Sequence, residues 1–283
     1  MIQSKQPIQH KSTNSIQLYM NSGNADIYMN GTIYKSSCVF FFEELLKISR
    51  QAIEMSVSVV SAQFPYSFYI INQFNNHIVI DGINYYFPYG NYNVNSFLTV
   101  WTTTIPGTWI NSFNSTTNKF TFSRATTFTM SDGNSNSILP VLGFISNTSY
   151  TSTFISGSYA ITSSTVVNFL GPMRLNIKTG SFNINNNYDT LEKGRTTTLC
   201  SVPVNSPAGG MITYYNLTQY KSIFKNHEIS TIQIDVQDDY GNPIIFNNKD
   251  WTMTIQVDIL NDITKDLSTL DDIYYQEQNE KNK

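Results

Sequence analysis

The three histidines, His10, His77 and His227, lie far apart in the sequence. None is at the spacing from another His or Cys that metal sites use, so we interpret each as structural or exposed. The sequence also lacks the G-x-S-x-G, phosphate-loop and H-E-x-x-H patterns that mark nucleophilic, nucleotide-binding and zinc-protease sites. These observations predict no catalytic site, no metal and no cofactor, and a protein that is not an enzyme.

A group of acidic side chains surrounds one turn near the C-terminus: Asp235, Asp238, Asp239 and Asp250. Their oxygens could hold Ca²⁺. Asp, Gly, Asn and Pro are also ordinary turn residues, and this interpretation is favoured, with a bound ion left open. Three glutamates could be imagined as a general acid and base: Glu43, Glu44 and Glu54. Nothing in the sequence distinguishes them from solvated charge.

Aromatic side chains offer binding rather than catalysis. Tyrosines are concentrated in one stretch: Tyr85, Tyr86, Tyr89 and Tyr92. They could stack on sugars or bases, or be buried against a neighbouring subunit. Charged residues make up 13% of the chain, against about 25% in a typical soluble domain, and aromatic residues make up 14%. Because interfaces are enriched in aromatic and depleted in charged side chains, this composition favours the subunit interpretation.

The formal net charge of −3 gives no reason to expect specific nucleic-acid binding. No apolar run approaches the ~18 residues that span a bilayer, and the amino terminus lacks the apolar core of a signal peptide. We therefore expect a protein made and kept in the cytoplasm. The two cysteines, Cys38 and Cys200, are too few for a disulfide scaffold and are interpreted as buried thiols.

Alternating apolar and polar residues predict antiparallel strands near the C-terminus. In residues 230–237 the inward set is Ile232, Ile234 and Val236, and the outward set is Gln233 and Asp235. In residues 250–259 the inward set is Trp251, Met253, Ile255, Val257 and Ile259, and the outward set is Thr252, Thr254, Gln256 and Asp258. Two such alternations indicate a sheet with one face on a core.

Residues 53–59 alternate in the same way and predict a half-buried strand, with Met55, Val57 and Val59 inward and Ser56 and Ser58 outward. For residues 36–49 the sequence is compatible with either a strand or a helix. The Phe run favours a strand, whereas EELLKI suits a helical turn. Many strands with few helices suggest a sandwich or jelly roll, so the expected fold class is all-β.

Residues 85–144 form a different kind of segment. One apolar helical face is predicted at i, i+3, i+4 and i+7: Val94, Phe97, Leu98 and Trp101. Asn91 or Asn93 can cap this helix, and Pro106-Gly107 ends it. Strands and turns follow over residues 108–130, where Phe120 and Phe122 share one face. The segment is therefore expected to be a small self-contained α+β unit.

Three segments carry a family resemblance in their order along the chain. Residues 53–72 read as a strand followed by S-A-x-x-P-x-x-x-Y-x-I-N. Then come PYGNYNVNSFLTVW (88–101), TTNKFTF (116–122) and VLGF (141–144). The last is IDVQDDYGNPIIFNNKDWTMTIQVDI (234–259), in which a turn leads to a final strand. Together they resemble the minor capsid, or penton, proteins of virophages, Polinton-type elements and related large DNA viruses.

The resemblance covers roughly residues 16–260 and implies an antiparallel jelly-roll penton base with a small α+β insertion domain. Five copies would close each icosahedral vertex as a homo-pentamer, in contact with trimers of the major capsid protein. A vertex fibre or a host surface receptor would be a further partner, and no specific nucleic acid is implied. The protein would be made in the host cytoplasm or viral factory and reside at capsid vertices.

The resemblance and the segmentation together give four parts. Residues 1–15 are expected to be a flexible N-terminal arm, 16–80 and 165–260 the jelly roll, 81–164 an outer knob, and 261–283 a C-terminal tail. The basic arm (Lys5–Lys11) and the acidic tail are expected to reach neighbours or the particle interior. In the tail one helical face could contain Leu267, Leu270, Ile273 and Tyr274, and a frayed or partner-docked end is equally compatible with the sequence.

Three other functions remain open. A receptor- or glycan-binding β module, such as a viral fibre head, would associate as a trimer and bind sugars. A jelly-roll enzyme acting on carbohydrate would need two carboxylates about 5–10 Å apart across one cleft. A jelly-roll protein of the capsid lattice would differ from a vertex protein in its copy number per particle.

Overall fold

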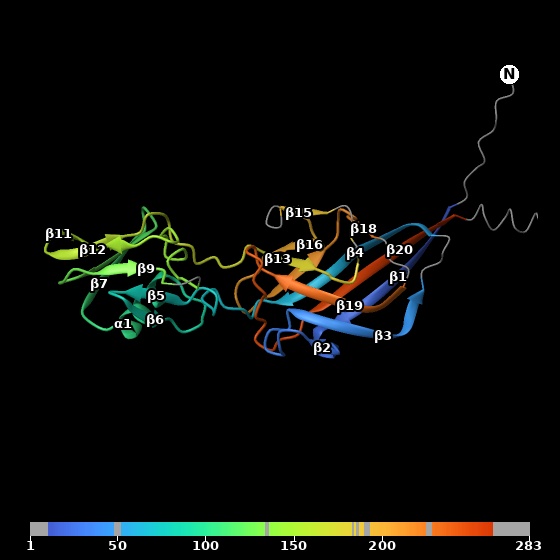
Figure 1. Cartoon of the computed structure of the whole chain (residues 1–283), viewed down its shortest axis with the longest axis horizontal. Helices are drawn as coiled ribbons and strands as arrows, with labels where there is room; N and C mark the ends of the chain where they lie inside the picture. The colour runs from blue at the N-terminus through green and yellow to red at the C-terminus, as the bar shows by residue number, and fades with distance from the viewer. Residues whose placement is uncertain are drawn as a thin grey trace, which may run out of the picture. The chain divides into compact units, whose positions relative to one another are not determined.

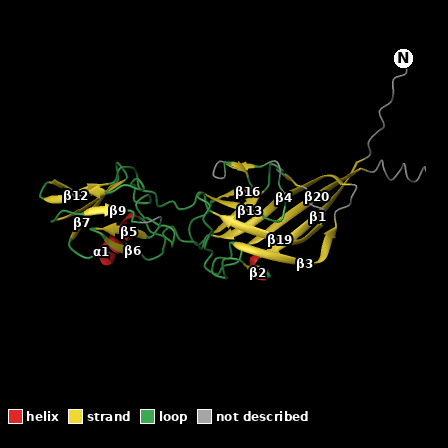
Figure 2. Ribbon diagram, viewed as in Figure 1, coloured by secondary structure: helices red, strands yellow, loops and turns green. Residues whose placement is uncertain are grey.

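The computed structural model describes residues 11–47, 52–133, 136–182, 184, 187–189, 193–224 and 228–262. The chain divides into two compact units: unit 1 comprises Met1–Ser67 and Arg174–Lys283, and unit 2 comprises Phe68–Met173. Nearly all regular structure in the described ranges is β-strand, with a single α-helix (Figure 2). Among the helices of these ranges, none has the length and hydrophobicity of a membrane span.

Unit 1 is a sandwich of two antiparallel sheets (Figure 1). Sheet 1 contains β1 (Lys11–Asn21), β20 (Thr252–Asp262), β4 (Ala52–Pro65), β17 (Met211–Tyr215) and β18 (Ser222–Phe224). Sheet 2 contains β16 (Thr198–Pro203), β13 (Arg174–Lys178), β19 (Glu228–Gln237), β3 (Ser37–Lys47) and β2 (Ile27–Tyr28). The short 3₁₀ helix η1 (Ser22–Asn24) and the hairpin β14 (Tyr188–Asp189) and β15 (Gly194–Arg195) complete the unit.

The order of the strands identifies the architecture. Eight strands form the sandwich: β1, β3, β4, β13, β16, β17, β19 and β20. Counted in chain order, sheet 1 contains the first, eighth, third and sixth of them, and sheet 2 the fifth, fourth, seventh and second. This interleaving of two sheets is a jelly roll. The predicted fold class, an all-β antiparallel jelly-roll sandwich interrupted by an insertion, is confirmed.

The inner faces of the two sheets form the core of unit 1. The alternation predicted for the two C-terminal strands is confirmed, because Ile232, Ile234 and Val236 of β19 are fully buried, as are Ile255 and Trp251. Residues 36–49, for which strand and helix were both open, contain β3, which pairs with β19 over most of its length.

Three residues predicted on the outer face of sheet 1 lie on that face but are buried there. Asp258 is only 6% exposed, because Ser15 of β1 and Lys221, just before β18, lie against its carboxylate. Ser56 and Ser58 are also buried, since these small side chains lie opposite Asp258 and Gln256 on the neighbouring strand β20.

The described residues of unit 2 form one helix and two four-stranded antiparallel sheets. The helix is α1 (Val94–Thr104). One sheet has the order β10 (Tyr150–Thr151), β9 (Thr129–Ser131), β5 (His77–Ile80) and β6 (Ile83–Tyr86). The other has the order β11 (Thr153–Ile155), β12 (Ser158–Thr162), β8 (Lys119–Arg124) and β7 (Trp109–Asn114).

Helix α1 begins where the sequence predicted. The Asn93 side chain accepts a hydrogen bond from the Ser96 backbone N–H at 2.9 Å, and the Ser96 hydroxyl accepts one from the Asn93 N–H at 2.9 Å. This reciprocal capping box satisfies two backbone donors at the start of the helix. Phe97 and Trp101 are fully buried, and the Trp101 ring stacks on Phe122 with centroids 3.9 Å apart. Unit 2 therefore has a hydrophobic core of its own.

The boundaries between the parts differ from those expected. The insertion was predicted at 81–164, whereas the contacts divide the chain before Phe68 and after Met173. Strand β5 pairs with β6 and β9, both in unit 2. At the other boundary, Phe169 packs on Phe97, with ring centroids 5.4 Å apart. The segments next to the predicted insertion therefore have their sheet and core partners inside unit 2.

The predicted arm and tail fall largely outside the described residues. Residues 11–15 of the predicted arm 1–15 instead belong to β1, which pairs with β20 from Lys11 onward. Residues 1–10 lie outside the described ranges, as does the tail from residue 263 onward with its apolar set Leu267, Leu270, Ile273 and Tyr274.

Candidate assembly surface

The histidines and glutamates considered as catalytic or metal-binding residues do not form a site in the structure. His77 is fully buried in unit 2, with its Nε2 2.8 Å from Asn84 Oδ1 and its ring 4.9 Å from that of Tyr86. His10 and His227 lie outside the described residues, as do the side chains of Glu43 and Glu44, whereas Glu54 is exposed. The two candidates that the structure describes, His77 and Glu54, lie in different units.

The four aspartates near the C-terminal turn have separate partners. Asp238 Oδ1 accepts hydrogen bonds from the backbone N–H groups of Tyr240 and Asn242, both at 2.8 Å, which fixes the turn. The other carboxylates contact Arg174 (Asp239, 2.5 Å), Lys35 (Asp250, 2.5 Å) and Ser37 (Asp235). Within the described ranges, no three His, Cys, Asp or Glu side chains are placed to hold a metal ion.

The two thiols are placed as expected for structural cysteines. Cys38 is fully buried in unit 1, and burial raises the pKa of its thiol to about 12. Cys200 is half-buried, and desolvation raises its pKa to about 12 as well. A thiol with such a pKa is almost entirely protonated at neutral pH and is a weak nucleophile.

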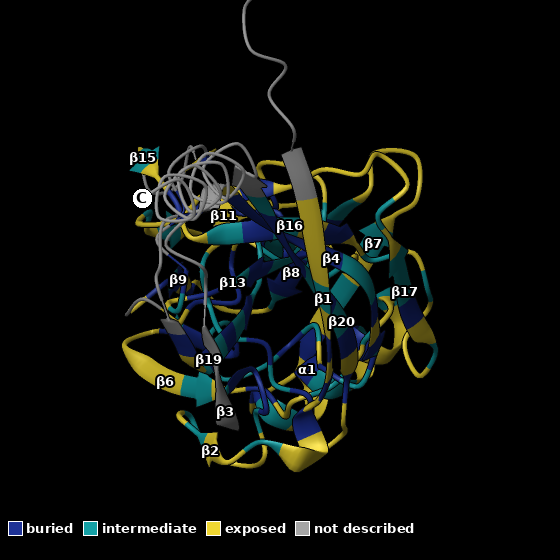
Figure 3. Cartoon of the chain, turned by 90° about the vertical axis from the view of Figure 1, so that its right-hand side faces the viewer, coloured by how far each residue is buried: buried dark blue, intermediate teal, exposed yellow. Residues whose placement is uncertain are grey.

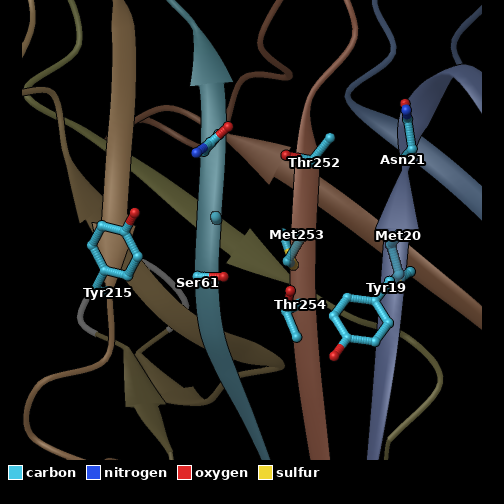
Figure 4. Close-up of a pocket in the computed structure, with 10 residues that line it drawn as sticks. Tyr19, Met20, Asn21, Ser61, Tyr215, Thr252, Met253 and Thr254 are labelled. Atoms are coloured by element: carbon cyan, nitrogen blue, oxygen red, sulfur yellow. The ribbon is translucent and has the colours of Figure 1, made fainter.

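The outer face of sheet 1 carries a shallow trough between two exposed tyrosines. One cross-strand row contains Tyr19 of β1, Thr254 of β20, Ser61 of β4 and Tyr215 of β17. Tyr19 is 78% exposed and Tyr215 is 62% exposed, whereas the hydroxyl side chains between them are short (Figure 4). The large rings at the ends and the small residues in the middle produce a trough of about 330 Å³.

Side chains around the trough are polar but uncharged. The next row along the same face contains Asn21, Thr252, Gln63 and Thr213. Uncharged polar groups and exposed tyrosines cost less to desolvate than lysine or glutamate, and protein interfaces favour them for this reason. This surface is suited to burial against another protein or a neutral ligand.

The same face also carries two acidic side chains further along the strands: Glu54 of β4, which is exposed, and Asp258 of β20, which is paired. The Asp258 carboxylate accepts hydrogen bonds from Lys221 Nζ at 2.6 Å, from Gln256 Nε2 at 2.8 Å and from the Ser15 hydroxyl. Burial opposes ionisation of this carboxyl group, but the hydrogen bonds from Lys221, Ser15 and Gln256 outweigh it and lower its pKa. Asp258 is therefore an ionised, paired group rather than a candidate acid.

The opposite side of the sandwich carries an exposed apolar cluster, here called the sheet 2 patch. It consists of Ile27 of β2, which pairs with Val39 of β3, and Phe41, two residues further along β3; Met29 and Ile33 are exposed in the loop after β2. Phe41 faces outward because its neighbour Phe40 is buried in the core. Unit 1 thus exposes apolar or aromatic side chains on both outer faces, and on the sheet 2 face the Asp26 carboxylate accepts a hydrogen bond from the Phe41 backbone N–H at 2.7 Å.

Unit 2 contains the tyrosines that the sequence singled out. Tyr86 and Tyr89 are more than half exposed, whereas Tyr85 and Tyr92 pack partly against the core. Tyr92 also borders a groove of about 520 Å³ whose other walls are mainly apolar: Val94, Phe113, Val166, Val167, Phe169 and Leu170. The tyrosine cluster is therefore split between core and surface.

Sequence reasoning placed Thr252 and Thr254 on the outward face of their strand but missed the two tyrosines of the trough. The alternation of Ile16, Leu18 and Met20 with Gln17 and Tyr19 was a usable signal for β1 and for an outward Tyr19. Tyr215 had no comparable signal, because its outward direction depends on the pairing of the short strand β17 with β4.

Two virophage structures are among the solved structures similar to this chain. No family model and no curated protein matches the chain. The crystal structure of the mavirus penton protein aligns with 88% of this chain and 99% of its own, at 9% identity and a TM-score of 0.44. The cryo-EM structure of the Sputnik virophage contains a chain that aligns with 90% of this one and 99% of its own, at 12% identity and a TM-score of 0.39. The function proposed below rests on the motifs and geometry of this chain itself.

Proposed function

We propose that the chain is a penton-type capsid protein whose copies associate as a ring of five to close the vertices of an icosahedral shell. The observation that carries the proposal is the pair of surfaces with exposed aromatic or apolar side chains on opposite faces of a jelly roll: the trough between Tyr19 and Tyr215, and the sheet 2 patch. The ordered motifs in residues 53–72, 88–144 and 234–259 support the same family.

Jelly-roll domains serve chiefly in viral capsids, lectins and cupins. Cupin-type chemistry takes place inside the roll, but here the interior between the sheets is filled by apolar side chains such as Ile232, Ile234 and Ile255, all fully buried. A function of unit 1 on its outer surface is therefore favoured over one inside the sandwich.

Ring closure explains why two different surfaces are useful. In a cyclic head-to-tail assembly each subunit uses one patch to bind the other patch of its neighbour, and the angle between the patches sets the number of copies. A single self-complementary patch would give a two-fold dimer instead. The trough and the sheet 2 patch lie on opposite faces of unit 1, so the trough of one subunit can bind the patch of the next.

The ends of unit 1 differ in a way that suits a shell. The chain leaves β4 after Pro65 and returns at Arg174 at one end of the sandwich, the end at which Trp251 donates a hydrogen bond to the Lys35 carbonyl. The start of β1 and the end of β20 lie together at the other end, since Lys11 pairs with Asp262 (Figure 1). We propose that the insertion end faces outward and the other end faces the interior and the major capsid protein.

Native mass tests the proposal directly. A pentamer of the 32.1 kDa chain would have a mass of about 160 kDa by native mass spectrometry or light scattering. If the protein is monomeric alone, it is mixed with the major capsid protein, and cryo-EM of the particles shows whether it occupies the vertices. A stable trimer, or density at positions other than vertices, would contradict the proposal.

Paired variants identify the surfaces. Replacing Tyr19 and Tyr215 by Ser should weaken ring formation at least tenfold, because the exposed rings are removed from the interface. The matched control is Tyr240→Ser, which removes an equally exposed ring (78%) from the β19–β20 turn, away from the trough. Equal assembly of the double variant and the control would exclude the trough from the ring contact.

A glycan-binding role is the second candidate, favoured by the same trough. Sugars stack on aromatic rings and accept hydrogen bonds from hydroxyl and amide groups, which Tyr19, Tyr215, Ser61, Thr254 and Gln63 supply. Sugar-array binding that is lost in the Tyr19→Ser, Tyr215→Ser double variant, in a protein without five-fold assembly, would support this role.

A further inference from the structure

Unit 2 has very few charged side chains. Residues 68–173 contain four of them: Asp81, Lys119, Arg124 and Asp132. Arg124 forms an ion pair with Asp81, and Lys119 Nζ donates a hydrogen bond to the Ser164 carbonyl at 2.8 Å. Both the lysine and the arginine of this unit are therefore engaged away from Asp132.

Asp132 is a buried carboxylate with one oxygen that has no partner. The residue directly follows β9 (Figure 3) and is only 8% exposed. Its Oδ2 accepts a hydrogen bond from the Asn147 backbone N–H, whereas its Oδ1 is buried without a hydrogen-bond partner in the part of the chain that the structure describes. An ionised carboxylate in such a place is costly unless a positive charge lies beside it.

The main chain fixes the position of Asp132. The next residue, Gly133, has a positive φ of 69°, and a Cβ atom here would lie 2.2 Å from Val79 Cγ2 and 2.8 Å from His77 Cε1. The chain can pass this close to β5 only because the residue has no side chain. The carboxylate is therefore held by the packing of Gly133 on β5 and by the hydrogen bond from Asn147.

The chain around Asp132 supplies further oxygen atoms. Asn147 is exposed, in the loop before β10, with a left-handed backbone (φ 57°). In the sequence, the segments SDGNSNS (131–137) and SNTS (146–149) have a side-chain oxygen on every residue except Gly133, and Asp132 is their only charged residue. Residues 134 and 135 lie outside the described ranges, and no contact is assigned to them.

We propose that Asp132 binds a calcium ion, with oxygen atoms of the 145–149 loop and water molecules as the further ligands. Calcium accepts six to eight oxygen ligands in flexible geometry, including amides, backbone carbonyls and water, whereas zinc prefers nitrogen and sulfur. The ion neutralises the carboxylate that neither Lys119 nor Arg124 reaches.

The site contains a single carboxylate among neutral oxygens. It therefore agrees with the finding that no three His, Cys, Asp or Glu side chains of the described ranges are placed to hold a metal ion. Because calcium affinity rises with the number of charged ligands, the expected Kd is about 10⁻⁴–10⁻³ M, as in weak calcium sites. The site belongs to unit 2 and is separate from the aspartate-rich turn of unit 1.

The first experiment titrates the full-length, chelator-treated protein with CaCl₂ by isothermal calorimetry. One ion per chain is expected, and Asp132→Asn should weaken its binding at least tenfold. The matched controls are Asp81→Asn, which changes the other acidic residue of unit 2, and Asp238→Asn, which changes the turn of unit 1. Both controls should bind normally. No calcium binding by the wild type, or loss of binding in the Asp238→Asn variant instead, would overturn the inference.

Thermal unfolding distinguishes a bound ion from an ordinary hydrogen bond. At about 10 mM CaCl₂ the midpoint of unit 2, followed by the NMR signal of the Trp101 indole N–H, should lie about 5 °C or more above its value in EDTA. The midpoint of the Asp132→Asn variant should not change with calcium. In EDTA this variant should unfold at no lower temperature than the wild type, because it carries no uncompensated charge.

Two results of this experiment would contradict the site. If Asp132→Asn is less stable than the wild type by the same amount in EDTA and in calcium, the carboxylate serves only to accept the Asn147 N–H. If MgCl₂ raises the wild-type midpoint as much as CaCl₂ does, the effect is one of ionic strength, since magnesium requires a more rigid octahedral site.

Discussion

Asp258 shows how a residue that the sequence placed in solvent becomes part of the structure. Its position in β20 follows the outward alternation, yet Lys221 and Ser15 lie against its carboxylate and leave it 6% exposed. A buried carboxylate is tolerated because its oxygens are hydrogen-bonded to a cation and to neutral donors. The pair joins three parts of sheet 1: β1, β20 and the segment before β18.

Replacing Asp258 by Asn should destabilise unit 1 by about 1–2 kcal/mol at pH 7, since a charge-assisted hydrogen bond is lost but Lys221, 42% exposed, is rehydrated. Folding lowers the pKa of Asp258 below its unfolded value of about 3.9, so its contribution is fully present above that pH. The contribution falls as the pH drops through the lower pKa of the folded state.

Urea unfolding followed by the NMR signal of the Trp251 indole N–H measures this difference, because Trp251 belongs to unit 1 whereas Trp101 and Trp109 belong to unit 2. The difference in the free energy of unfolding between wild type and the Asp258→Asn variant should become smaller from pH 7 to pH 3. As a control, Asp239→Asn breaks the more exposed pair with Arg174 and should cost no more than about 0.5 kcal/mol. A gap for Asp258→Asn that is constant with pH would show that the carboxylate charge does not stabilise the fold.

The thiols give a second prediction at the residue scale. Burial raises the pKa of both Cys38 and Cys200 to about 12, so at pH 8 each is almost entirely in the unreactive protonated form. A disulfide reagent such as DTNB should modify the native protein at least a hundredfold more slowly than the protein in urea. Rapid reaction of one thiol in the native state, located by mass spectrometry, would show that its site opens.

At the scale of elements, helix α1 depends on its first residues. Asn93→Ala removes the acceptor of the capping box and should destabilise unit 2 by about 1 kcal/mol. Asn95→Ala, in the first turn and exposed, is the matched control and should have little effect or slightly stabilise the helix. Thermal unfolding of unit 2 provides the measurement, and equal midpoints for the two variants would contradict the capping role.

Elements were predictable where local pattern and tertiary environment agree. Strands β19 and β20 alternate strictly because one face of each lies on the core, and the face of α1 was evident from Phe97 and Trp101. Strand β5 was assigned to the wrong unit because four residues, His77–Ile80, do not reveal their partners. The trough depends on cross-strand neighbours from β1, β4, β17 and β20, which the sequence does not bring together before the sheet order is known.

At the scale of the whole molecule, the two units should fold separately. Unit 2 has its own core, with Trp101, Phe120 and Phe122 fully buried within it. Residues 68–173 expressed alone should therefore give a cooperative thermal transition and dispersed amide NMR signals. The shorter segment 81–164, which lacks β5, is the natural comparison and should not fold cooperatively. A molten spectrum for residues 68–173 would show that unit 2 requires unit 1.

The central position of β20 has a consequence for synthesis on the ribosome. This strand lies between β1 and β4, so sheet 1 cannot close until the last described strand of the chain has emerged. Unit 2 is complete in sequence long before then, and its contacts are local by comparison. We expect a nascent chain in which unit 2 is already folded while β1 and β4 are still unpaired, because β20 has not yet been synthesised. Chaperones would bind the chain mainly during that interval.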